Sequence, residues 1–127
     1  MLIILKHWLW VVLWAGLIFV LSSIPRLESG LEHDFLLRKL AHIFEYFVFT
    51  WLLYSAFSNH YIKTNKKHPP HRQALIFVLL LAVFYAVSDE LHQTFVFGRS
   101  GNLRDVAIDF VGILAAIVFL YWRRVFR

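Results

Sequence analysis

The chain of 127 residues is 60% hydrophobic and 18% aromatic, with a mean hydropathy of +0.64. This composition excludes an ordinary small soluble domain, because a globule of this size keeps much of its surface in water, and the lack of cysteine excludes disulfides and cysteine nucleophiles. The net charge of +5 does not indicate nucleic acid binding, because the basic residues lie between long apolar runs, as membrane loop anchors do.

Four apolar runs follow one another along the chain, at about residues 8–24, 40–57, 74–97 and 106–122. Each is close to the roughly 20 residues that cross a hydrocarbon core of about 30 Å. No alternation of period two competes, and helices satisfy their own backbone in lipid. The sequence therefore predicts an all-α integral membrane bundle of four transmembrane helices, forming a single domain over residues 1–127.

The first run has a secretory signal as its alternative interpretation, because Lys6 and His7 precede it. A signal has a shorter apolar core and a small-x-small cleavage site, whereas this run carries Trp8, Trp10 and Trp14. We therefore interpret it as a membrane helix.

The distribution of charge predicts the orientation. The N-terminus, the 58–73 loop and the C-terminus together hold eight basic residues and no acidic one, whereas the opposite side holds five basic residues and all eight acidic ones. Cytoplasmic loops carry the excess of Lys and Arg. We expect a multi-pass protein of the cytoplasmic membrane with both termini in the cytoplasm, and membrane lipid as a partner.

Ionisable side chains beside the apolar runs are the candidate functional residues, because charge at membrane depth costs roughly 2.5–3.5 kcal/mol by insertion scales. They share helical faces at the outer end of the predicted bundle. The candidate catalytic residues are His42, Glu45, Asp89 and His92. The candidate ligand-binding residues are Lys39, Tyr46, Glu90, Gln93, Arg99, Ser100, Arg104, Asp105 and Asp109.

Two other interpretations of this cluster stay open. In a purely structural network, Arg99, Arg104 and Lys39 neutralise the acids, and Asp105 is the N-cap of the fourth helix. In a metal-dependent enzyme, the i, i+3 pairs formed by His42 with Glu45 and by Asp89 with His92 are metal ligands, as in carboxylate-bridged bundles. A divalent metal is then the cofactor. Glu90 lies off the helical face that carries Asp89 and His92, so we expect it to serve in packing or in an interface contact.

The chain resembles the VanZ-like family of membrane proteins. The match lies in residues 21–25 (LSSIP), 39–46 (KLAHIFEY), 89–101 (DELHQTFVFGRSG) and 105–112 (DVAIDFVG). The chain departs from the family pattern at Arg38, where an acid is frequent, and at Phe97, where proline is frequent. The resemblance implies a bacterial cell-envelope context, since the family is named for a protein that lowers susceptibility to the glycopeptide teicoplanin.

The leading functional prediction is an envelope protein whose outer pocket binds or acts on an anionic lipid-linked or envelope molecule. Guanidinium groups match phosphate oxygens in a bidentate way, and the carboxylates and histidines are suited to proton transfer. A lipid-linked envelope precursor is the expected partner. The sequence leaves open whether the chain is an enzyme, with the metal-dependent enzyme and a non-catalytic structural or partner-binding protein as alternatives.

Overall fold

The computed structural model describes residues 2–25, 34–63, 71–99 and 101–125. These residues form four α-helices and no strand: α1 (Leu2–Ser23), α2 (Asp34–Lys63), α3 (His71–Gln93) and α4 (Leu103–Val125). The all-helical expectation and the number of helices are thereby confirmed.

The helices extend beyond the apolar runs in most places, since an α-helix makes its hydrogen bonds internally and continues through polar residues. α3 is different, because it ends at Gln93 and not at the predicted Phe97. The amides of Thr94, Phe95 and Val96 donate to carbonyls three residues back, and Gly98 follows with a φ of 79°. A positive φ suits glycine, which has no Cβ to clash. Tight turns thus replace the last predicted turn of helix.

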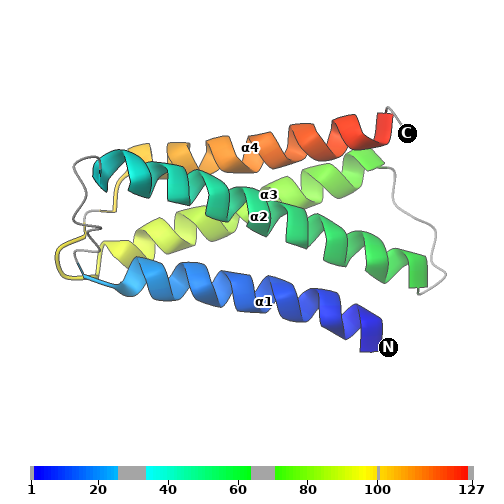
Figure 1. The fold of residues 1–127 in the computed structure, drawn as a ribbon, viewed down its shortest axis with the longest axis horizontal. Helices are drawn as coiled ribbons and strands as arrows, with labels where there is room; N and C mark the ends of the chain where they lie inside the picture. Colours follow the sequence, from blue (N-terminus) through cyan, green and yellow to red (C-terminus); the bar gives the residue numbers. More distant parts are fainter. Residues whose placement is uncertain (1, 26–33, 64–70, 100, 126–127) are drawn as a thin grey trace.

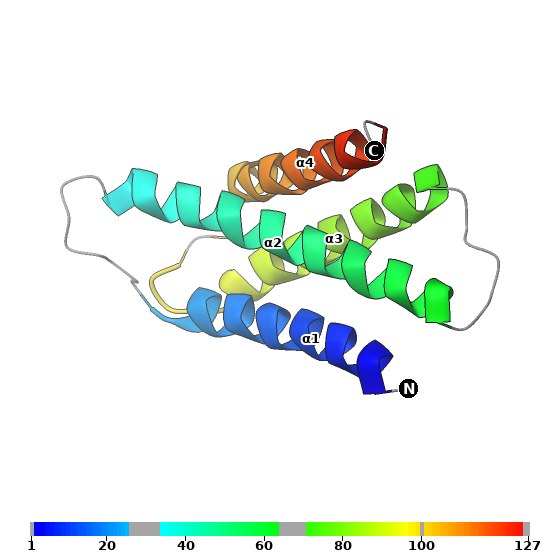
Figure 2. The same ribbon diagram turned by 45° about the vertical axis from the view of Figure 1, so that its right-hand side comes forward.

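The helices run roughly along one long axis (Figures 1 and 2). α1 begins and α4 ends at the same end of the bundle, while the C-terminal ends of α1 and α3 lie at the opposite end with the beginnings of α2 and α4 (Figure 1). Within the described residues, α2 contacts all three other helices and α1 does not contact α4. The candidate residues at the end of α3 and the beginnings of α2 and α4 therefore share one end, called here the polar end.

The bundle buries small and aromatic side chains between its helices and exposes large apolar ones. Tyr46, Ala56, Ala82 and Ile113 are fully buried. In contrast, Phe84 at the middle of α3 is 74% exposed, and more than twenty other large apolar side chains are exposed with it. Apolar surface on this scale, spread around the bundle, marks a membrane-facing exterior.

Three of the helices are long and apolar enough to cross a membrane, over Leu5–Ser23, Leu36–His60 and His71–Gln93. The protein is therefore a multi-pass membrane protein by its helix lengths and composition. α4 has Arg104, Asp105 and Asp109 near its beginning and Arg123 and Arg124 near its end.

Candidate functional site

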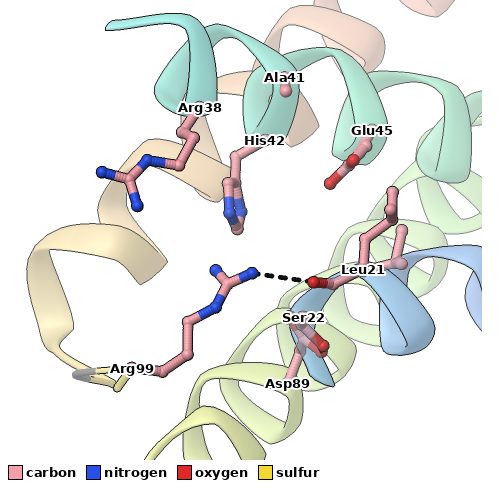
Figure 3. A pocket seen from close by; sticks show the side chains of 9 residues that line it. Leu21, Ser22, Arg38, Ala41, His42, Glu45, Asp89 and Arg99 are labelled. Atoms are coloured by element: carbon pink, nitrogen blue, oxygen red, sulfur yellow. Dashed lines mark hydrogen bonds between the residues drawn. The ribbon is translucent and has the colours of Figure 1, made fainter. Parts of the chain in front are cut away.

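A small inner pocket opens between α1, α2 and α3 at the polar end. Figure 3 shows His42 and Glu45 extending from α2 toward Asp89 and the guanidinium of Arg99. The pocket is lined by Ile18, Leu21, Ser22, Arg38, Ala41, His42, Glu45, Asp89 and Arg99. Its volume is about 40 Å³, which is on the scale of one water molecule. A water molecule fits in this pocket and can relay a proton between its side chains, but a larger ligand does not fit.

A larger outer pocket, of about 310 Å³, adjoins it and shares Arg38, His42 and Arg99. Its lining is Arg38, Lys39, His42, Gln93, Gly98, Arg99, Asn102, Arg104, Asp105 and Ile108. The lining contains four cationic side chains but a single carboxylate, that of Asp105. Its volume reaches the lower end of the roughly 300–1,000 Å³ typical of small-molecule sites. Size and charge together suit an anionic group.

The inner pocket borders a buried pair between α2 and α4. His42 Nδ1 lies 3.0 Å from Asp109 Oδ1, and the Asp109 side chain is fully buried. The other carboxylate oxygen of Asp109 and the hydroxyl of Tyr46 are buried without a hydrogen-bond partner among the described residues. Buried polar atoms without partners are uncommon in folded proteins, which distinguishes these two atoms from the satisfied polar groups around them.

The beginning of α4 is held by two further contacts. Asp105 forms an ion pair with Lys39 of α2. The N-cap is Asn102, whose Oδ1 accepts the amide of Arg104 at 2.8 Å. The expectation that Asp105 is the N-cap is therefore wrong, because the helix begins one residue after Asn102. The Asp105 carboxylate lies in the first turn of α4, where its negative charge interacts favourably with the positive end of the helix dipole.

The end of α1 is joined to α3 through two serines. Ser22 Oγ donates to Asp89 Oδ1 at 2.6 Å, and Gln93 Nε2 donates to Asp89 Oδ2 at 3.0 Å. Ser23 Oγ lies 3.0 Å from His92 Nε2. Both oxygens of Asp89 thus have neutral donors. Ser22 and Ser23 were not among the candidate residues; the signal that could have found them is the family-like stretch at residues 21–25.

Arg99 also binds the end of α1. Its Nη2 donates to the carbonyl of Leu21 at 2.8 Å, as Figure 3 shows, and its Nε donates to the carbonyl of Ile24 at 3.2 Å. The last carbonyls of a helix lack partners within the helix, and Arg side chains can supply them. Arg99 therefore has a structural role at the site and also contributes charge to both pockets.

Glu45 differs from its acidic neighbours. Its backbone carbonyl accepts Trp14 Nε1 at 2.9 Å, which fixes α2 against α1. Its carboxylate lines the inner pocket and makes no hydrogen bond with the residues that the structure describes. It lies near enough to His42, Asp89, Asp109 and Arg99 for their charges to interact. Glu45 is the acid of this site that is least committed to holding the fold.

The structure brings most of the candidates to the polar end and separates them in role. His42, Glu45, Asp89 and Arg99 line the inner pocket, and Lys39, Gln93, Arg104 and Asp105 line the outer one. His92 faces α1 and lines neither pocket. Ser100 lies outside the described residues. Arg38 lines both pockets and was treated in the sequence only as a departure from a family pattern.

The proposed metal ligands are not gathered. Within the described residues, no group of three or more His, Asp or Glu side chains is arranged to hold a metal ion. His42 contacts Asp109, whereas His92 contacts Ser23 on the other side of Asp89. The two i, i+3 pairs therefore do not converge on one centre.

A helical, multi-pass membrane protein with a cationic pocket over a buried acid–histidine cluster is the class that this arrangement defines. The family model VanZ/LLP1 matches residues 4–125, which is nearly the whole chain. The chain belongs to this family, and the resemblance seen in its motifs is confirmed. Comparison with curated proteins and with solved structures gives no match.

Proposed function

We propose that the chain is a cell-envelope membrane protein that binds the phosphate group of an anionic lipid-linked or envelope molecule in the outer pocket. The observation that carries the proposal is the lining of that pocket, with Arg38, Lys39, Arg99 and Arg104 against the single carboxylate of Asp105. Guanidinium groups donate paired hydrogen bonds to phosphate oxygens. Membership of the VanZ/LLP1 family supports the envelope part of the proposal, because the resemblance to this family implies a bacterial cell-envelope context.

In this proposal the residues of the inner pocket exchange protons with a ligand bound in the outer pocket. His42 lines both pockets and contacts Asp109, so it can pass a proton between the buried cluster and a ligand in the outer pocket. Glu45 stands at the inner end with a carboxylate that is uncommitted among the described residues. Histidine and carboxylate groups at hydrogen-bond distance are suited to general acid–base chemistry.

We also propose that α4 crosses the membrane, giving four spans with the polar end outside the cell. Residues 106–122 contain one charged side chain, Asp109, which is buried against His42 and is not presented to lipid. The basic excess at the opposite end of the bundle supports a cytoplasmic location for both termini. In this orientation the outer pocket lies at the level of the outer-leaflet headgroups.

The test is a binding titration with the purified protein in detergent. Dioctanoyl phosphatidic acid and dioctanoylglycerol share their acyl chains and differ in the phosphate. We expect the phosphatidic acid to bind at least about tenfold more tightly, because a hydrogen bond to a charged group contributes roughly 1.5–3 kcal/mol. Inorganic phosphate as competitor shows whether the phosphate alone is recognised or whether the lipid anchor is needed.

Arg104→Gln is the informative variant, because this exposed side chain has no part in the α1 contacts that Arg99 makes. It should weaken the binding of phosphatidic acid by about tenfold, equivalent to about 1.4 kcal/mol. Arg123→Gln, at the opposite end of α4 and also exposed, is the matched control and should change nothing. Equal affinity for both lipids, or equal loss in both variants, would refute the proposal.

A further inference from the structure

A second recess lies on the face of the bundle between α3 and α4. It consists of two adjoining hollows of about 240 and 250 Å³ that share Leu103 and Val106. The hollow nearer the polar end is lined by Val87, Glu90, Leu91, Thr94, Gly101, Asn102, Leu103 and Val106. The other is lined by Val83, Ala86, Leu103, Val106, Ala107, Phe110 and Ile113. We call the two together the α3–α4 groove.

A single carboxylate, that of Glu90, lies in this mainly apolar groove. Glu90 is 4% exposed, and its Oε2 accepts the backbone amide of Asn102 at 2.8 Å. Its Oε1 is buried and has no hydrogen-bond partner among the described residues. A buried carboxylate oxygen without a donor is costly. The carboxylate is held in place by one oxygen and presents the other without a partner.

The loop beside Glu90 is fitted closely against α3. A Cβ on Gly101 would lie 2.3 Å from the carbonyl oxygen of Glu90 and 2.6 Å from Cγ2 of Thr94. The loop backbone therefore rests directly on α3, whereas the groove side, which Glu90 lines, is a hollow. Val87 and Leu91, which flank that side, are 47% and 60% exposed.

A phospholipid has an apolar chain and a polar headgroup, so it matches both the apolar lining of the groove and its single carboxylate. Hydrocarbon surrounds this face in a membrane, and an acyl chain can follow the apolar lining from Leu103 toward Ile113. The chain's polar end then lies at the level of Glu90, near the end of the bundle. Charge complementarity with a carboxylate favours a headgroup with an ammonium donor over a neutral one.

We propose that the α3–α4 groove binds one phospholipid with a primary ammonium headgroup, which donates a hydrogen bond to Glu90 Oε1 while an acyl chain lies along α4. This lipid site is separate from the outer pocket. Asn102 lines both, but none of the cationic side chains of the outer pocket lines the groove. The groove selects for a donor, whereas the outer pocket selects for an anion.

The experiment is native mass spectrometry of the full chain after reconstitution with equal amounts of phosphatidylethanolamine and phosphatidylcholine. The two lipids share chains and phosphate, but the methylated choline headgroup has no hydrogen-bond donor. We expect retained phosphatidylethanolamine to exceed phosphatidylcholine by about tenfold, the ratio that corresponds to a hydrogen bond with a charged group. Equal retention of the two lipids, or a lipid-free dimer of the chain, would overturn the proposal.

Three variants make the test specific to the groove. In Glu90→Gln the amide oxygen can keep the Asn102 contact while the amide NH₂ faces the groove. The ratio of retained phosphatidylethanolamine to phosphatidylcholine should therefore fall toward one. Ala107→Trp fills the groove and should remove retention of both lipids. Leu13→Trp adds the same side chain to an exposed position on α1, which does not contact α4 in the described residues, and should leave retention unchanged.

The groove and the outer pocket can fail independently. Arg104→Gln should lower phosphatidic acid binding and leave the phosphatidylethanolamine preference intact. If Glu90→Gln does not fold, the lipid ratio on the natural chain and its loss in Ala107→Trp still decide the question. Retention that persists in Ala107→Trp would place the lipid elsewhere on the bundle.

Discussion

His42 Nδ1 lies 3.0 Å from Asp109 Oδ1 in the buried interface between α2 and α4. The two residues are separated by 67 positions in the chain, so their contact fixes how the second half of the molecule joins the first. The same contact places His42 at the wall shared by the inner and outer pockets. The pair therefore joins α2 to α4 and also forms part of the wall of the proposed ligand site.

Asp109→Ala should lower the free energy of unfolding in detergent by roughly 1–3 kcal/mol, because it leaves a mostly buried imidazole without its partner. Thermal unfolding followed by circular dichroism measures the effect. The control is Asp105→Ala, which removes the partly exposed Lys39 pair and should cost less than about 1 kcal/mol. An equal loss in both variants would show that burial of the His42–Asp109 pair carries no special weight.

Gly112→Ala should separate α2 from α4. A Cβ at this position would lie 2.2 Å from the carbonyl oxygen of Ile43, a distance at which backbone must move. Overpacking of this kind costs roughly 1–3 kcal/mol, and a lower melting temperature in detergent measures it. Gly16→Ala is the matched control, since no atom lies within 4 Å of its added Cβ. It should be neutral or slightly stabilising, because Ala favours helix over Gly.

The sequence predicts the helices well because a membrane span needs a long apolar run, and four runs are visible without knowledge of any contact. It also places His42, Glu45, Asp89 and Asp109 at one end of the bundle, since alternate helices reverse direction. These predictions depend only on local composition and chain direction.

The contacts that arrange the site could not be predicted in the same way. Ser22 reaches Asp89 across 67 positions, and which serine meets which acid depends on the rotation of α1 about its axis. α1 is apolar on every side, so its sequence has no stripe that sets this rotation. The predicted end of the third helix was also wrong, because residues 95–97 are apolar yet lie in tight turns toward Gly98. No pattern in the sequence predicts the hydrogen bond that the Asn102 amide donates to Glu90.

The orientation can be tested on intact cells, because the natural chain has no cysteine. A single cysteine at Phe95, which is 81% exposed beside the polar end, should react with a membrane-impermeant thiol reagent. A cysteine at Asn65, which lies outside the described residues, should react only after the cells are opened. Labelling of Asn65 and protection of Phe95 in intact cells would reverse the proposed topology.

Glu45→Gln and His92→Ala test whether the polar cluster acts or only holds the bundle together. The readout for function is teicoplanin susceptibility of a bacterial host that produces the chain, compared with the same host without it, because the family is named for a protein that lowers this susceptibility. The readout for structure is the amount of folded protein in the membrane and its melting temperature in detergent. We expect both variants to lose function. Glu28→Gln, a predicted loop acid outside the described residues, should behave as the natural chain.

The two variants differ in how far they disturb the fold. The Glu45 carboxylate makes no hydrogen bond with the described residues, so Glu45→Gln should keep normal abundance and melting temperature. His92 contacts Ser23 and packs against Phe19 with ring centroids 4.4 Å apart, so His92→Ala should lower stability by roughly 1–3 kcal/mol. Ser23→Ala is its control, because it removes the same hydrogen bond and keeps the imidazole.

The combination of outcomes separates the functional reading from the structural one. If Glu45 only balanced charge, its removal would leave buried partners uncompensated, and breaking a buried ion pair costs roughly 3–5 kcal/mol. Abundance would then fall together with function in Glu45→Gln. Loss of function with full abundance in Glu45→Gln, and retained function in Ser23→Ala beside its loss in His92→Ala, assign chemistry to Glu45 and to the imidazole. Unchanged susceptibility in both variants would show that neither Glu45 nor His92 takes part in the function.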